Sequence, residues 1–387
     1  MADRVAIVGV GHTQFRATSP GLSYKELMFE AATKAYADAG IDPRRDIDSF
    51  VCCSEDLSEG TGIFDEYVPD QIGAALRPVH TIAGDGLQGV IAAYLQILTG
   101  AFDVVAVEAH SKASNILTPN YVLALALDPI YVRPLGAHPH VVAGLEMARY
   151  LYESGTNREQ CAHVVAKNRG NALFNDAAGY GADLKPEEVL QAAAAFAPLS
   201  RLDVAAPADG AVVVVLASEA RARALDAESV WVLGAGWCTD TPALDSRQWG
   251  VAHYAHLAAQ QAYRLAGITT PSREIDFAEV DDTFSYKELQ HLEALGLFHP
   301  GEAGPATVEG LTSMDGDLPV NPSGGSLGVG HLGEATGLYR LVEAVRQLRG
   351  EAGPRQLPDV EVGLAQSWRG VPTTTGAVVV LGAEPEA

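Results

Sequence analysis

The sequence predicts an α/β fold built from two related halves. Three observations indicate it: the strand-like segments are continuous apolar runs, helical patterns alternate with them, and one order of glycine-rich turn, helix and strand occurs twice. Continuous apolar runs are typical of strands buried on both faces, because helices then cover both sides of the sheet. Alternation of strands with helices places the chain in the α/β class.

The expected elements follow from these patterns in chain order. A short apolar stretch ends at the glycine turn of HTIAGDG, residues 80–86, and predicts a strand entering a helix. The other predicted strands cover residues 5–11, 47–53, 102–109, 210–217, 229–236, 277–282, 360–366 and 376–382. The predicted helices cover residues 24–40, 86–100, 252–267 and 334–350.

The repeated order predicts an internal duplication. GDGLQGVIAAYLQILTG followed by AFDVVAVEA matches GHLGEATGLYRLVEAVRQLRG followed by DVEVGLAQ. We therefore expect an N-terminal half over residues 1–222 and a C-terminal half over residues 223–387. The stretch of about 112–208 contains no clear strand and is expected to be an insertion in the first half. A site between two such halves would lie where their strand and helix ends meet.

The composition excludes several classes of function. The chain is 48% hydrophobic and 19% charged, which is typical of a globular protein. Its net charge of −23 disfavours nucleic acid or an anionic membrane as partner. There is no 18-residue apolar run and no signal-peptide pattern at the N-terminus, so we expect a cytoplasmic protein. The four cysteines lack zinc-ligand spacing, which predicts buried, reduced thiols and no metal site.

The strongest local signal is NPSGGSLGVGHLGEATG, residues 321–337, a glycine-rich turn with His331 just before a helix. It could be a glycine-rich loop with an incidental histidine. It also resembles the Asn-Pro-x-Gly-Gly…Gly-His-Pro-x-Gly-Ala-x-Gly segment of the thiolase superfamily, and VAIVGVGHTQF with APLSRLDVAAPADGAVVVVLAS resembles its sterol-carrier-protein-x branch. The resemblance implies a thiolase-like, five-layered αβαβα fold, a dimer, CoA thioesters as substrates and no cofactor.

The turn at residues 83–86 departs from that family. The family's nucleophilic cysteine falls on Ala83, while Gly86 matches the glycine of the same motif. The turn therefore presents no thiol. Asp85 in this turn is interpreted as a helix N-cap that accepts backbone N–H groups, with a catalytic or substrate-binding role as the alternative.

The family's second motif reads EVDDTFSYKEL here. Asp281 replaces the usual histidine or tyrosine, and Asp282 keeps the following aspartate. A carboxylate beside another can have a raised pKa and act as a base. The alternative is that Asp282 caps and orients while Asp281 is merely tolerated. Tyr286, one turn later, could reach the same cleft or pack in the core.

The third motif keeps Gly330, His331 and Gly333. In the family this histidine polarises a thioester or keto oxygen, which requires a donor about 3 Å from the oxygen that gains charge. The fourth motif reads SWRGVPTTTG and carries no cysteine, so no second thiol can act there as an acid or base.

Three weaker candidates complete the set. His138 and His140 are two residues apart, which could form a metal-ligand pair but is more typical of loop or lid histidines. Lys112 and Arg169 lie on or near the insertion that holds CoA in relatives. Each could bind a phosphate or be a solvated surface charge.

These substitutions favour chemistry that needs no acyl-enzyme. The sequence resembles the cysteine-less, thiolase-like aldolases of steroid side-chain degradation, which implies retro-aldol cleavage of a β-hydroxyacyl-CoA. Those enzymes work with a small OB-fold, zinc-containing partner that binds the acyl-CoA. Two alternatives stay open: a non-catalytic acyl-CoA-binding subunit of a thiolase-type complex, and an acetyl-CoA acyltransferase that uses a displaced residue.

Overall fold

A computed structural model describes residues 4–56, 63–225, 227–372 and 374–384. Its largest element is a nine-stranded sheet with the order β3-β2-β4-β7-β1-β8-β11-β10-β9, and β5 and β6 form a separate pair. The strands are β1 (Val5–His12), β2 (Ser49–Cys53), β3 (Val79–Ile82), β4 (Val104–Lys112), β5 (Ala194–Phe196), β6 (Leu199–Ser200), β7 (Asp209–Ser218), β8 (Val230–Thr239), β9 (Phe277–Glu279), β10 (Val362–Trp368) and β11 (Thr375–Gly382). Every predicted strand is thus confirmed, although β9 ends before the Asp281–Asp282 pair.

The helices include the four that were predicted. The longer ones are α1 (Tyr24–Ala39), α5 (Gly86–Leu98), α7 (His140–Ser154), α8 (Arg158–Asn171), α11 (His253–Ala266), α13 (Ser285–Ala294) and α16 (Thr336–Leu348). The short ones are α2 (Pro43–Asp46), α4 (Pro69–Ile72), α6 (Pro119–Ala124), α9 (Pro186–Gln191), α10 (Glu219–Ala224), α12 (Pro271–Glu274), α14 (Ala303–Val308) and α15 (Gly325–Val329). Within the described residues, no helix is long and apolar enough to cross a membrane.

The sheet repeats one pattern of strand pairing. In the first half β1 pairs antiparallel with β7, β7 antiparallel with β4, and β4 parallel with β2. In the second half β8, β11, β10 and β9 follow the same order with the same directions. The two sets join where β1 pairs with β8. This confirms the duplication, and the expected boundary at residue 222 falls within α10.

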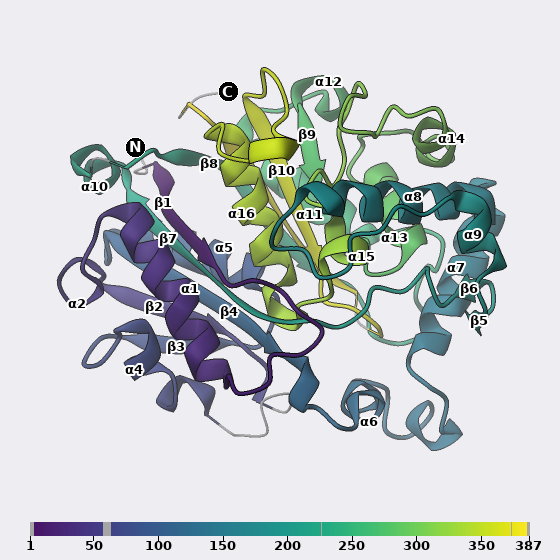
Figure 1. The fold of residues 1–387 in the computed structure, drawn as a ribbon, viewed down its shortest axis with the longest axis horizontal. Coiled ribbons are helices and arrows are strands. Elements are labelled where there is room, and N and C mark those ends of the chain that lie inside the picture. The colour runs from purple at the N-terminus through teal and green to yellow at the C-terminus, as the bar shows by residue number, and fades with distance from the viewer. Residues whose placement is uncertain (1–3, 57–62, 226, 373, 385–387) are drawn as a thin grey trace.

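The helices form three layers around the two half-sheets (Figure 1). One hydrophobic core lies under α1, a central core surrounds α5 and α16, and a third lies under α11 and α13. Helix, sheet, helix, sheet and helix thus make up the thiolase-like αβαβα arrangement. Glycines in β1 and β8 let α1 and α11 pack closely against these strands. A Cβ on Gly9 of β1 would lie 2.4 Å from the carbonyl oxygen of Ala35 in α1, and a Cβ on Gly234 of β8 would lie 2.0 Å from the carbonyl oxygen of Ala262 in α11.

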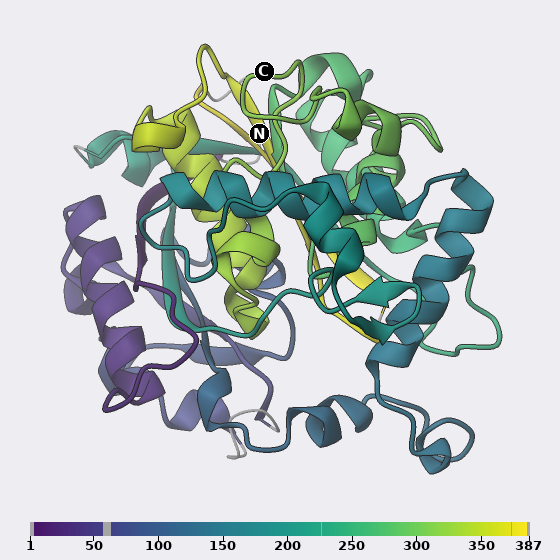
Figure 2. The same ribbon diagram turned by 45° about the vertical axis from the view of Figure 1, so that its right-hand side comes forward.

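The insertion is mainly helical but contains strands that the sequence did not reveal. The prediction of no strand is wrong for β5 and β6, which are too short to show a periodic pattern. Helix α8 begins with a capping box of Asn157 and Gln160, which satisfies two backbone donors at its start. Both ribbon views show α8 lying beside α15, and the two helices pack together (Figure 2). The insertion therefore covers the glycine-rich motif of the second half.

Candidate active site

The two central helices meet at Asp85. This residue is the N-cap of α5, and its carboxylate accepts the backbone N–H of Leu87 at 2.8 Å and that of Gly337 in α16 at 2.9 Å. A side chain on Gly337 would collide with this carboxylate, since its Cβ would lie 2.0 Å from the Asp85 Oδ1. Burial raises the pKa of Asp85 to about 6, although the two N–H groups oppose that shift. The N-cap interpretation is confirmed.

Replacing Asp85 with Ala is expected to lower the free energy of unfolding by about 1–2 kcal/mol, because two buried backbone N–H groups lose their acceptor. The measurement is a urea titration followed by circular dichroism. Asp42→Ala is the matched control, because Asp42 caps only the short, exposed α2. A loss at Asp85 no larger than that at Asp42 would contradict the shared cap.

The turn after β9 holds Asp282 as an anchor for α15. Its carboxylate accepts the backbone N–H of Ser326 at 2.6 Å, that of Leu327 at 3.1 Å and the Asn168 side-chain amide at 2.8 Å. The backbone at Gly325 passes so close that a Cβ there would lie 2.2 Å from Oδ2 of Asp282. Burial raises the pKa of Asp282 to about 6. These contacts match the capping and orienting interpretation of Asp282.

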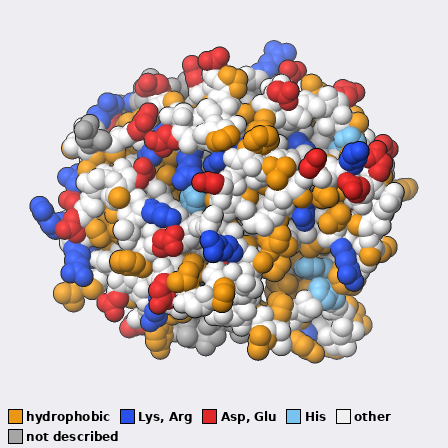
Figure 3. Space-filling view, in the orientation of Figure 1, with side chains coloured by type: hydrophobic (Ala, Val, Ile, Leu, Met, Phe, Trp, Pro, Cys, Tyr) orange, Lys and Arg blue, Asp and Glu red, His pale blue; other side chains and the backbone are white. Residues whose placement is uncertain are grey.

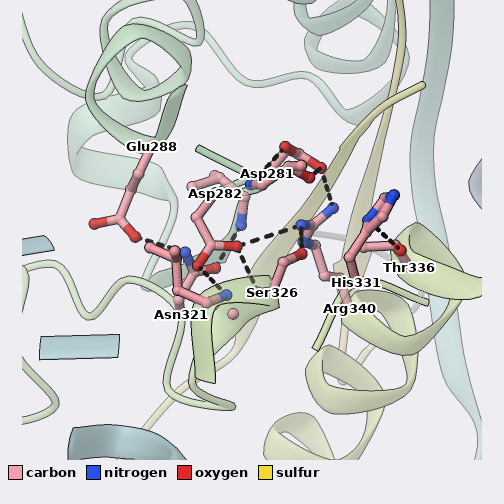
Figure 4. Close-up of polar contacts among 12 residues, drawn as sticks. Asp281, Asp282, Glu288, Asn321, Ser326, His331, Thr336 and Arg340 are labelled. Atoms are coloured by element: carbon pink, nitrogen blue, oxygen red, sulfur yellow. Dashed lines mark hydrogen bonds and ion pairs between the residues drawn. The ribbon is translucent and has the colours of Figure 1, made fainter. Parts of the chain in front are cut away.

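Asp281 is held in a buried ion pair with Arg340. The two side chains are 2.8 Å apart, and the same guanidinium also lies 3.4 Å from Asp282 and donates to the Ser326 hydroxyl at 2.7 Å (Figure 4). Burial favours the protonated form of Asp281, but Arg340, the nearby histidines and the Thr283 N–H together outweigh it, and the pKa of Asp281 stays below its ordinary value. Of the two adjacent aspartates, the one with a raised pKa is therefore Asp282. A base at Asp281 would first have to leave Arg340.

His331 follows the left-handed turn that Gly330 makes at the end of α15, with φ at +118°. Its backbone N–H donates to the Ala206 carbonyl at 2.8 Å, which fixes the turn against the C-terminal end of the insertion. The imidazole is half-buried, with Nδ1 3.4 Å from the Thr336 hydroxyl, and its other ring nitrogen points away from Thr336 (Figure 4). Burial lowers the pKa of His331, so the ring is neutral at pH 7.

The glycines on either side of His331 are required by the backbone. A Cβ on Gly330 would lie 2.7 Å from the Ala208 Cβ, and Gly333 has φ at +54° as the chain turns into α16. A cavity of about 10 Å³ lies between this turn and Arg340, about the volume that one water molecule needs. The glycine-rich motif thus forms the wall of a polar site.

Tyr286 lies outside this site. Its hydroxyl donates to Glu146 of α7 at 3.0 Å, and the side chain is fully buried in the hydrophobic core under α11 and α13. Lys287 beside it is also fully buried and pairs with the same Glu146 at 2.8 Å. The geometry therefore supports the packing alternative, and the catalytic expectation for Tyr286 needs correction because its hydroxyl is engaged.

The two cationic side chains expected to bind CoA, Lys112 and Arg169, lie in different surroundings. Lys112 forms a buried ion pair with Asp209 at 2.6 Å and donates to the Ser19 carbonyl at 3.0 Å. Its charge is already neutralised inside the protein, so the structure contradicts its assignment to a phosphate. Arg169 on α8 is half-buried, its buried Nε has no hydrogen-bond partner among the described residues, and burial lowers its pKa.

No thiol takes the place of a nucleophile. Ala83 is exposed in the turn between β3 and α5. Cys52, Cys53 and Cys161 are fully buried and Cys238 is half-buried. Burial raises the pKa of all four thiols, so each is protonated at pH 7. The described residues also contain no cluster of three or more side chains that could hold a metal ion.

Comparison with known proteins identifies the family. Residues 236–383 match the family described as thiolase C-terminal domain-like. The chain is 32% identical to an acetyl-CoA acetyltransferase of Methanothermobacter thermautotrophicus, over 94% of this chain and 95% of that protein. The chain belongs to the thiolase superfamily. The resemblance predicted from the motifs is therefore confirmed.

Two further members of this superfamily match along nearly their whole length. The 17-hydroxy-3-oxo-4-pregnene-20-carboxyl-CoA lyase of Mycobacterium tuberculosis is 29% identical over 97% of this chain and 98% of the lyase. A solved structure described as an Ltp2-ChsH2(DUF35) aldolase superposes with a TM-score of 0.85 at 27% identity, covering 98% of this chain and 97% of that one. Relatives of this thiolase-like chain thus include both an acyltransferase and a lyase.

Proposed function

We propose that this thiolase-like protein cleaves a carbon–carbon bond of a β-hydroxyacyl-CoA by a retro-aldol reaction. The observation that carries the proposal is the state of the four cysteines, each protonated and three of them fully buried, with Ala83 in the exposed turn. Thiolysis through an acyl-enzyme needs an activated cysteine. A retro-aldol reaction needs only a base and a donor to the thioester oxygen.

The reaction balances without an oxidant or a second substrate. A base takes the proton of the β-hydroxyl, the Cα–Cβ bond breaks, and the β-carbon becomes a carbonyl. The electron pair moves into the thioester enolate, which takes a proton at Cα and leaves as a shortened acyl-CoA. Neutral His331 is suited to donate to the thioester oxygen, as charge develops there, from the ring nitrogen that points away from Thr336.

The full-length relatives support a lyase. One is named a steroid carboxyl-CoA lyase, and the aldolase structure names a DUF35 partner. By analogy we propose an acyl-CoA of lipid or steroid side-chain degradation as substrate. We also propose a homodimer that works with a small OB-fold, zinc-containing protein as its acyl-CoA-binding partner.

The test is a turnover assay with the chain co-expressed with such a partner. CoA products are followed by mass spectrometry from a β-hydroxyacyl-CoA without free CoA, and from a 3-ketoacyl-CoA with it. Cleavage of the hydroxy substrate supports the proposal. A CoA ester that binds without reacting indicates a non-catalytic subunit instead.

The acetyltransferase relative favours a second candidate, an acyltransferase. That enzyme would cleave the 3-ketoacyl-CoA alone and leave a covalent acyl group on a protein side chain. Cys53 is the thiol to examine first, because it lies beneath α5, close enough to Asp85 for their charges to interact. An adduct at Cys53 in the intact protein mass would decide for this candidate.

Arg169 is proposed to bind a phosphate of CoA. Replacing it with Gln is expected to raise KM for the CoA ester about tenfold and to leave kcat unchanged, because one charge-assisted hydrogen bond is lost. The same substitution should have no effect on a pantetheine ester, which lacks the nucleotide phosphates. Arg264→Gln, on the exposed face of α11, is the control. An equal KM change with both esters would contradict the assignment.

A further inference from the structure

The proposed reaction needs a base, and the side chains expected to supply it are engaged elsewhere. Asp281 is paired with Arg340 and also accepts the Thr283 backbone N–H at 3.0 Å. Asp282 accepts two backbone N–H groups of α15, and the Tyr286 hydroxyl donates to Glu146. Each of these side chains is thus already held by buried contacts that fix its position.

The ring nitrogens of His140 are not held in this way. It is the first residue of α7, its imidazole is half-buried, and neither ring nitrogen has a hydrogen-bond partner in the part of the chain that the structure describes. Its ring packs edge-on against Phe284 with centroids 5.3 Å apart. Phe284 follows the Asp281–Asp282 pair by two residues, so this contact fixes the imidazole beside the turn after β9.

His140 also lies near His331. The two imidazoles are close enough for a charge on one to disfavour a charge on the other. Burial lowers the pKa of His140 to about 4, so both rings are neutral at pH 7. Figure 3 shows imidazole groups at the edge of a recessed apolar area, on the side where Figure 1 places β5, β6 and α7.

The neighbouring histidine, His138, contacts a different aromatic ring and already accepts a hydrogen bond. His138 stacks on Phe196 with centroids 4.7 Å apart, and its Nδ1 accepts the backbone N–H of His140 at 3.1 Å. Its acceptor nitrogen is therefore occupied. Of the pair, only His140 keeps an uncommitted acceptor, and His138 holds the start of α7 in place.

We propose that His140 is the general base that takes the β-hydroxyl proton, while His331 donates to the thioester oxygen. The inference rests on the proposed function and deepens it. The O–H bond breaks as the His140 N–H bond forms, the Cα–Cβ bond breaks to leave a carbonyl and a thioester enolate, and a proton is then delivered to Cα. The insertion thus contributes a reacting group beside His331 of the second half.

The test compares His140→Gln and His140→Ala with the unchanged protein on a β-hydroxyacyl-CoA. Loss of a general base is expected to lower kcat about 10²–10⁴-fold with KM nearly unchanged. Added imidazole should restore part of the activity of His140→Ala, because a free base can enter the vacated space, and should not change the rate of the unchanged protein. His256→Gln, at an exposed histidine of α11, is the control and should retain full activity.

The pH profile gives a second measurement that needs no variant. The unchanged protein should keep kcat/KM constant from pH 8 down to about 5 and lose it as His140 becomes protonated. His138 and His331 are the titratable groups whose charge acts on His140. The charged residues of α13 are paired elsewhere: Lys287 forms an ion pair with Glu146, and Glu288 forms one with Lys167. If kcat/KM instead continued to rise as the pH increased above 8, the base would be another group and the inference would be overturned.

The remaining outcomes separate the two proposals. If the unchanged protein cleaves the hydroxy substrate and His140→Gln, folded by circular dichroism, stays within threefold of it, the inference is overturned and the proposed function stands. If the unchanged protein with its partner does not cleave the substrate, both fall. Loss of activity in His140→Ala that imidazole does not restore would indicate a positioning role and also overturn the inference.

Discussion

Replacing Arg340 with Met is expected to lower the free energy of unfolding by about 3–5 kcal/mol, because removing one partner of a buried ion pair leaves the other charge uncompensated. Arg340 is 2% exposed and forms ion pairs with both Asp281 and Asp282. Guanidinium-induced unfolding measures the loss. Arg346→Met, six residues later on α16 and only half-buried, should change stability by less than about 0.5 kcal/mol.

The loss at Arg340 should depend on pH in a defined direction. Arg340 holds the pKa of Asp281 low, so the ion pair stabilises the fold above the unfolded pKa of about 4 and ceases to do so as the carboxylate is protonated. The folded variant binds more protons than the folded wild type. The stability difference should therefore be largest at pH 7 and narrow toward pH 4. A difference that grows on acidification would contradict this role.

Replacing His331 with Ala is expected to lower kcat about 10²–10³-fold, the loss typical of removing one donor to a developing oxyanion. The side chain is half-buried with one long contact to Thr336, so the fold should be retained. Steady-state assays on the β-hydroxyacyl-CoA measure the rate, and thermal unfolding checks stability. His331→Asn, which keeps a side-chain N–H, should recover part of the lost activity. Equal losses in both variants, or a melting shift, would point to a structural role.

The strands and central helices were predictable because burial on both faces of the sheet leaves continuous apolar runs. The glycine-rich motif was also predictable, since only glycine tolerates the backbone at Gly330 and the approach of Gly325 to Asp282. Arg340 was missed because it is one of several charged residues in this helix, among them Glu343 and Arg346. A charge in a helix is usually a solvated one, and only the layered structure reveals that α16 is covered on nearly all sides.

Long-range pairing explains the other errors. Lys112 looked free in the sequence because its partner Asp209 lies 97 residues away, on the strand that pairs with β4. His140 was considered only with His138, whereas its relevant neighbours, Phe284 and His331, come from the second half of the chain. A local pattern shows residue types, but the topology decides which of them meet.

The shared cap at Asp85 makes the two halves interdependent. Its two backbone donors, Leu87 and Gly337, stand on either side of the duplication, with Gly337 252 residues away along the chain. The Gly337 N–H of the second half finds its acceptor in the first half, so the start of α16 depends on a residue outside its own half. Fragments corresponding to the two halves should accordingly acquire native structure only when mixed.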